Sequence, residues 1–173
     1  FNIAYPLSMP KSLIPRPFNK NLKKIKNKLK TQGILIWNNA HVAYLLNLRS
    51  FELVNSTKPF AGLFIPKKNV KPLLITNNFN LKKIAKIRNN FNIFREEKFI
   101  KYLKLLKFKN IETSYEYLNL STYMRLSNFL NINETKINIS KYMGIKTKKE
   151  IKNIKNCHVE DGFAVLKFII DLK

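Results

Sequence analysis

Hydrophobic residues near the start of the chain recur at helical spacing. Leu22, Ile25 and Leu29 lie three or four positions apart among lysines in residues 19–31, which is typical of an amphipathic helix. Gly33 follows closely, and glycine is common just after the last turn of a helix. The pattern therefore predicts a helix over 19–31 that ends before Gly33.

The next hydrophobic positions predict a strand, a helix and a pair of strands. The unbroken apolar run 34–37 is typical of a buried strand, and Asn38 or Asn39 is expected to cap the helix that follows. The apolar runs 58–66 and 70–76 are separated by three polar residues, so we expect two antiparallel strands.

Helical and strand patterns then alternate along the chain. Pro72 has no N–H to donate, so it is expected at the start or edge of its strand. Apolar spacings of three and four predict further helices over 80–89, 98–108 and 120–130. Short apolar runs predict further strands over 91–94, 110–114 and 135–140. This alternation, with one hairpin, indicates an α/β fold whose mixed sheet is covered by helices.

The final segment predicts one long helix. Thr147 and Glu150 have the spacing of a capping box, in which each side chain bonds the backbone of the other residue. Apolar residues then recur at spacings of three and four as far as Leu172. Since no later element of the chain can cover this apolar face, we expect its partner in further sequence or in another chain.

The first 18 residues carry four prolines, which exclude a helix through them. The chain also opens on Phe1 rather than methionine, so we expect residues 1–18 to be a linker from a preceding domain. No apolar run has the length of a membrane span, and the order of residues is not that of a signal peptide. With a single cysteine, Cys157, the sequence predicts a cytoplasmic protein.

The composition is strongly basic, with 33 lysines and arginines against 10 acidic residues and a formal net charge of +23. Such a charge favours binding to nucleic acid or to acidic partners, because lysine neutralises phosphates. However, lysine greatly outnumbers arginine, and asparagine, isoleucine and phenylalanine are abundant as well. A+T-rich codons supply these residues, so we favour codon composition as the origin of the charge and keep nucleic-acid binding as the alternative.

A possible metal cluster lies near the end of the chain, where Cys157, His158, Glu160 and Asp161 fall within five residues. In a helix, residues two apart point in nearly opposite directions, so Glu160 cannot join His158. His158 and Asp161 can share a face and are expected to form a hydrogen bond there. The sequence therefore predicts no metal site in this chain, and the absence of phosphate-loop and nucleophile-elbow motifs leaves no catalytic residue assigned.

Two stretches together resemble three-domain aminopeptidase P, the Xaa-Pro aminopeptidase family of metallopeptidases. In residues 40–50, the matching positions are Ala43, Leu45, Asn47 and Arg49. In the last part of the chain, the matching positions are Lys146, Glu150, His158, Asp161, Gly162, Ala164, Phe168 and Leu172. The departures are Tyr44 for tryptophan, Ser50 for glycine, Cys157 for alanine and Asp171 for tryptophan.

The resemblance implies a division of the chain. Residues 19–140 would be the middle, creatinase-N-terminal-like domain, and residues 141–173 the first, truncated part of the catalytic pita-bread domain. The motif residues on that last segment, Thr147, Glu150, His158, Asp161 and Gly162, would be structural.

The resemblance also implies a function. The family uses two divalent metals, usually manganese, to remove an N-terminal residue ahead of proline, and all metal ligands would follow residue 173. This chain would therefore be inactive alone and would shape active-site access and dimerisation, with Asn47 and Arg49 as candidates for substrate or interface contact. Its partners would be the rest of the same chain or a separately encoded catalytic half, in a homodimer acting on Xaa-Pro peptides. The alternative is a basic, non-enzymatic binding module for nucleic acid or acidic partners.

Overall fold

A six-stranded mixed sheet forms the centre of the protein in the computed structural model, which describes residues 6–10, 14, 16–52 and 56–172. Its spatial order is β6 (Asn92–Phe94), β5 (Leu73–Ile75), β4 (Gly62–Pro66), β2 (Gly33–Ile36), β7 (Asn110–Thr113) and β8 (Asn131–Glu134). β4 runs antiparallel to both β2 and β5, whereas β6 is parallel to β5, and β2, β7 and β8 are parallel to one another.

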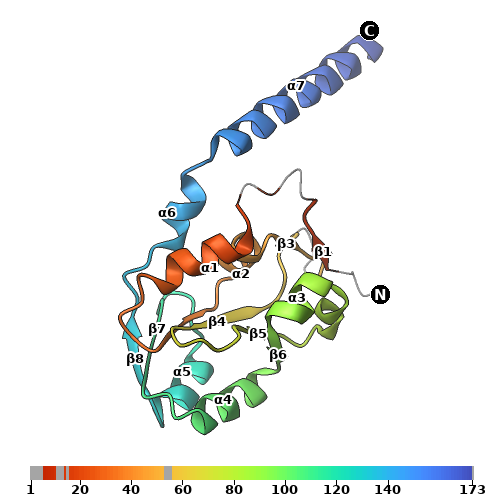
Figure 1. Ribbon diagram of the computed structural model, residues 1–173. Helices are drawn as coiled ribbons and strands as arrows, with labels where there is room; N and C mark the ends of the chain where they lie inside the picture. Colours follow the sequence, from red (N-terminus) through yellow and green to blue (C-terminus); the bar gives the residue numbers. More distant parts are fainter. Residues whose placement is uncertain (1–5, 11–13, 15, 53–55, 173) are drawn as a thin grey trace.

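Helices cover both faces of the sheet (Figure 1). One face carries α1 (Phe18–Lys26), α2 (Asn39–Leu46), the 3-10 helix η1 (Phe79–Lys83), α3 (Ala85–Asn90) and α6 (Ile139–Gly144). The opposite face carries α4 (Glu96–Leu105) and α5 (Leu120–Ser127). A mixed sheet covered by helices is the predicted fold, and the α/β prediction is confirmed.

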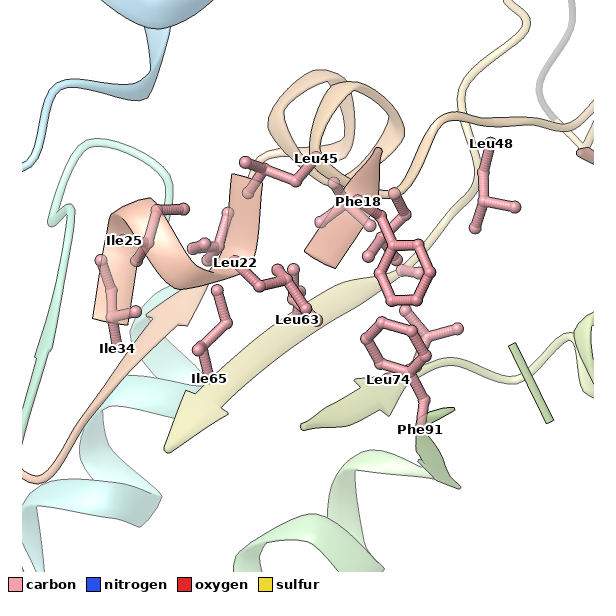
Figure 2. Close-up of a cluster of buried hydrophobic side chains, with 14 of the residues drawn as sticks. Phe18, Leu22, Ile25, Ile34, Leu45, Leu48, Leu63, Ile65, Leu74 and Phe91 are labelled. Carbon is pink, nitrogen blue, oxygen red and sulfur yellow. The ribbon is translucent and has the colours of Figure 1, made fainter. Parts of the chain in front are cut away.

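Two hydrophobic cores lie on the two faces of the sheet. Leu63 and Ile65 of β4 point to the side of α1 and α2, where they pack with Leu22 and Ile25 (Figure 2). Phe64, between them, points to the opposite side and packs on α4. Because both faces are covered, the central strands are buried along their whole length, and this explains their unbroken apolar sequence.

Several predicted local features are confirmed. Asn38 caps α2, since its side-chain oxygen accepts hydrogen bonds from the backbone N–H groups of Ala40 and His41 at 2.8 and 3.2 Å. β4 and β5 form the predicted antiparallel pair. Pro72 directly precedes β5, and its carbonyl accepts a hydrogen bond from the backbone N–H of Asn92 at 3.0 Å.

The prediction that Gly33 ends the first helix is wrong. α1 already ends at Lys26, and Gly33 is the first residue of β2. A Cβ atom at Gly33 would lie 2.6 Å from Cζ of Phe64, so a glycine is needed for the close approach of this ring. Leu29 lies beyond the helix yet is buried, which explains why it matched the helical spacing.

The strand predicted over 135–140 is also wrong. β8 lies earlier, at Asn131–Glu134, and α6 begins at Ile139 with Asn138 as its cap. Ile137 and Ile139 are both buried in the core beside α2. Their two-residue spacing imitates a strand because a loop residue and a first-turn helix residue happen to reach the same core.

Three predicted helices differ in detail from the observed ones. The helix predicted over 120–130 is α5, which already ends at Ser127. The helix predicted over 80–89 is divided into η1 and α3, which meet at Ile84. The helix predicted over 98–108 is α4, which ends at Leu105, so Leu106 lies beyond it and is 40% exposed.

The N-terminal segment adds a second, small sheet. β1 (Leu7–Ser8) pairs antiparallel with β3 (Leu48–Arg49), directly after α2. Within the predicted linker, residues 1–5, 11–13 and 15 lie outside the described residues. The domain boundaries predicted at 18/19 and 140/141 stay predictions.

Candidate functional site

Asn47 fixes the path of the chain where α2 ends. Its backbone is left-handed, with φ 51° and ψ 48°, a conformation that asparagine tolerates better than most residues. Its side-chain amide donates a hydrogen bond to the carbonyl of Arg16 at 2.9 Å, and its own carbonyl accepts one from the N–H of Met9 at 3.2 Å. Asn47 is 4% exposed, so in this chain it holds the N-terminal segment against α2.

Arg49 and Ser50 follow in β3 and just after it. One guanidinium nitrogen of Arg49 donates to the carbonyl of Leu48 at 2.9 Å, and the side chain remains partly exposed. Ser50 is fully buried, but its hydroxyl donates to the Glu52 carboxylate at 2.6 Å and its N–H donates to the carbonyl of Thr57. The buried hydroxyl of Ser50 is therefore satisfied, and Arg49 keeps donors available for a partner.

Tyr44, which the sequence singled out as a departure from the motif, and Lys86, which it did not, stabilise the same region. The hydroxyl of Tyr44 donates to the carbonyl of Tyr142 in α6 at 3.0 Å, and burial raises the pKa of Tyr44. The ammonium of Lys86 donates to the carbonyl of Leu46 at 2.8 Å and lies 4.7 Å from the ring centroid of Phe18. Burial lowers the pKa of Lys86. Only the fold brings these residues together, because they are distant in sequence.

The last helix, α7 (Lys148–Asp171), begins with the predicted capping box. The N–H of Glu150 donates to the Thr147 hydroxyl at 3.1 Å, and the N–H of Thr147 donates to the Glu150 carboxylate at 2.7 Å. The helix has 24 residues, a length of about 36 Å, and projects away from the sheet domain (Figure 1).

The acidic and histidine residues of α7 do not form a site. His158, Asp161 and Gly162 are exposed, as are Cys157 and Glu160. The expected hydrogen bond between His158 and Asp161 is not formed within the described part of the chain. Among the described residues, no three His, Cys, Asp or Glu side chains gather where they could hold a metal ion.

The apolar side chains of α7 are uncovered. No described residue of the helix is buried, and in its C-terminal half the charged residues Glu160, Lys167 and Asp171 share one side, while most of the remaining circumference is apolar. The exposed apolar side chains of that half include Phe163 (70%), Leu166 (54%), Phe168 (63%), Ile170 (62%) and Leu172 (70%). An apolar stripe of this kind typically packs on a hydrophobic core.

Comparisons with known proteins give matches at the level of structure. No family model and no curated protein matches the sequence. An X-prolyl aminopeptidase from Caenorhabditis elegans, a cytosolic enzyme with a di-nuclear active site, matches with a TM-score of 0.80 and 16% identity over 97% of this chain. The N-terminal domain of an X-Pro dipeptidase from Streptococcus pyogenes matches with a TM-score of 0.52 and 16% identity over 73% of this chain and 99% of its own.

The chain has the creatinase/prolidase N-terminal fold. A Xaa-Pro dipeptidase from Bacillus anthracis has it as well, with a TM-score of 0.55 and 20% identity over 78% of this chain. The present chain spans 29% of the length of the nematode enzyme and 37% of the length of the Bacillus enzyme.

The match to the nematode enzyme extends beyond the creatinase/prolidase N-terminal fold itself. It leaves only 3% of this chain uncovered, whereas α7 accounts for 24 of the 173 residues. Most of α7 therefore has a counterpart in that longer enzyme.

No helix in the described part of the chain has both the length and the apolar character needed to cross a membrane.

Proposed function

We propose that this chain is the non-catalytic portion of a Xaa-Pro aminopeptidase, in which it shapes access to the active site and supports dimerisation. The observation that carries the proposal is the exposed apolar helix α7, which follows a creatinase/prolidase N-terminal fold and has a counterpart in an X-prolyl aminopeptidase. The sequence matches at Asn47, Arg49, His158, Asp161 and Gly162 support the same assignment. A cytoplasmic location belongs to this proposal.

In this proposal the partner is the catalytic domain, as further sequence of the same polypeptide or as a separate chain. The C-terminal half of α7 would pack its wide apolar side on that domain, because burial there removes the exposed apolar side chains from water. Asn47 would act indirectly, by fixing the turn that presents Arg49. Arg49 is the residue we propose for contact with substrate or with a second subunit.

The chemistry would be supplied entirely by the partner. Two divalent metal ions, manganese in this proposal, would generate a hydroxide nucleophile and polarise the scissile carbonyl there. The described residues of this chain do not fit as ligands, since their acidic and histidine side chains do not converge. No catalytic step is therefore assigned to a residue of this chain.

An activity assay tests the proposal. The isolated chain with manganese is expected to release no N-terminal residue from an Xaa-Pro peptide, whereas the native protein purified from its source is expected to release it. Turnover by the isolated chain would place catalysis within these 173 residues. Native protein that does not cleave Xaa-Pro peptides would contradict the assignment to an aminopeptidase.

A basic binding module is the second candidate function. Lys30, Lys67 and Lys68 line one hollow of about 340 Å³ beside the start of β2. Such a group of lysines could bind a phosphate backbone, with an affinity that falls steeply as salt rises. This function predicts a gel shift with preference among nucleic acids, lost at high salt; no shift at any salt concentration would contradict it.

A further inference from the structure

A cavity of about 300 Å³ lies where β2, β7 and β8 end. The residues that directly follow these strands line it: Trp37 and Asn38 after β2, Ser114 after β7 and Thr135 after β8. These three strands are parallel, so the cavity opens at their shared carboxyl edge. Its volume lies at the lower end of the range of about 300–1,000 Å³ that small-molecule pockets occupy.

The connections from β2 and β7 leave this edge in opposite directions. The chain passes from β2 to α2, which packs on one face of the sheet, and from β7 to α5, which packs on the other. Neighbouring parallel strands whose connections diverge leave a crevice between the two loops, and α/β proteins bind their ligands in such crevices. The position of the cavity is therefore a consequence of the topology.

Aromatic side chains form one part of the wall. Trp37 lies so close to Gly62 that a Cβ atom there would be 2.7 Å from the indole ring, so the indole packs on β4, and Trp37 lines both this cavity and a second hollow beside Gly62. The rings of His41 and Tyr117 meet edge to face, with their centroids 5.4 Å apart. A hydrogen bond with the Glu116 carboxylate raises the pKa of Tyr117.

His41 is a nearly buried polar group in this wall. It is 8% exposed, and its Nε2 lies 2.9 Å from the hydroxyl of Ser140. Its other ring nitrogen, Nδ1, has no hydrogen-bond partner among the described residues. Burial lowers the pKa of His41, although Glu116 opposes this effect, so the ring is neutral at pH 7.

The charges around the cavity differ in sign from those of the whole protein. Glu116 and Glu134 line it, against one lysine, Lys136, in a chain with more than three basic residues for each acidic one. Glu134 accepts a hydrogen bond from the N–H of Tyr115 at 2.7 Å. Within the described residues, neither carboxylate forms an ion pair, so both keep their charge for a ligand.

We propose that this cavity binds a small organic cation that carries a guanidinium group. Glu116 and Glu134 would neutralise the charge, and the faces of Trp37 and Tyr117 would attract it through cation–π contact. His41 Nδ1 would supply one further polar contact. The proposal is independent of the peptidase assignment, since it uses none of Arg49, Asn47 or α7.

Fluorescence provides a direct test because Trp37 is the only tryptophan of the chain and lines the cavity. Titration with L-argininamide is expected to change the emission saturably. Its near-isosteric analogue L-citrullinamide keeps the α-amino group but has a neutral urea in place of the guanidinium, and it is expected to bind at least about tenfold more weakly, as the loss of a charged hydrogen bond requires. Equal affinity for the two probes, or no saturable change with L-argininamide, would overturn the proposal.

Three variants test whether L-argininamide binds in this cavity. Glu116→Gln is expected to weaken L-argininamide binding by about tenfold, whereas Glu160→Gln, an identical change on the distant α7, leaves it unchanged. Lys136→Gln removes the opposing charge and is expected to tighten binding, a gain that misfolding cannot produce. Unchanged affinity in Glu116→Gln, or weaker binding in Lys136→Gln, would overturn the assignment to this cavity.

Discussion

Replacement of Phe64 by alanine is expected to lower the free energy of unfolding by about 3–5 kcal/mol. Phe64 is 1% exposed and lies in the central strand β4. Its ring centroid is 5.6 Å from that of Phe99 and 5.3 Å from that of Phe108, and the ring also fills the space beside Gly33. Truncation would leave a cavity between β4 and α4 that surrounding side chains cannot close.

Phe60→Ala is the matched control, because this phenylalanine is four residues away and 58% exposed. Its unfolding free energy is expected to change by less than about 0.5 kcal/mol. Urea unfolding followed by circular dichroism measures both variants, with an unchanged slope required for a valid comparison. If Phe64→Ala cost no more than Phe60→Ala, the ring would not have the packing described for β4.

The double variant Phe163→Glu, Phe168→Glu is expected to abolish self-association of the isolated chain without changing the stability of its sheet domain. These side chains are 70% and 63% exposed on α7, and exposed apolar surface of this kind associates in water. α7 has no buried residue, so charges on it remove no packing within the chain. Size-exclusion chromatography with light scattering, compared with the mass of 20.4 kDa, reports the association.

The double variant Lys155→Gln, Lys167→Gln is the control, because it changes the net charge by the same amount and keeps every apolar side chain of α7. It is expected to associate as the original chain does. A monomeric original chain, or an urea midpoint lowered by the phenylalanine substitutions, would show that α7 is covered by its own domain.

The sequence predicted the architecture wherever a segment is buried on one or two faces. The runs that became β2 and β4 are apolar throughout, because both faces of the sheet are covered. The capping side chains of Asn38 and Thr147 also predicted where α2 and α7 begin, because a cap is a local interaction.

Where tertiary contacts decide the structure, local patterns were misleading. Gly33 was interpreted as a helix end, but the ring of Phe64, which is distant in sequence, requires it.

Local sequence patterns also do not reveal the candidate binding sites. The cavity combines Trp37, Glu116 and Lys136 from three separate connections, and only strand order brings these together. Asn47 and Arg49 were found through a resemblance, and the structure adds the hydrogen bonds that hold Asn47.

The strand order of the sheet also favours a particular order of folding during synthesis. β2, β4, β5 and β6 are complete by residue 94, and all of their pairings join strands that are consecutive among those of the six-stranded sheet. The pairing of β7 with β2 is far less local, since 78 residues separate Thr113 from the Leu35 carbonyl that it bonds. Closing a longer loop costs more entropy, and chains emerge from the ribosome N-terminus first. The four-stranded half can therefore form on the ribosome, and β7 and β8 then add to the open edge of β2.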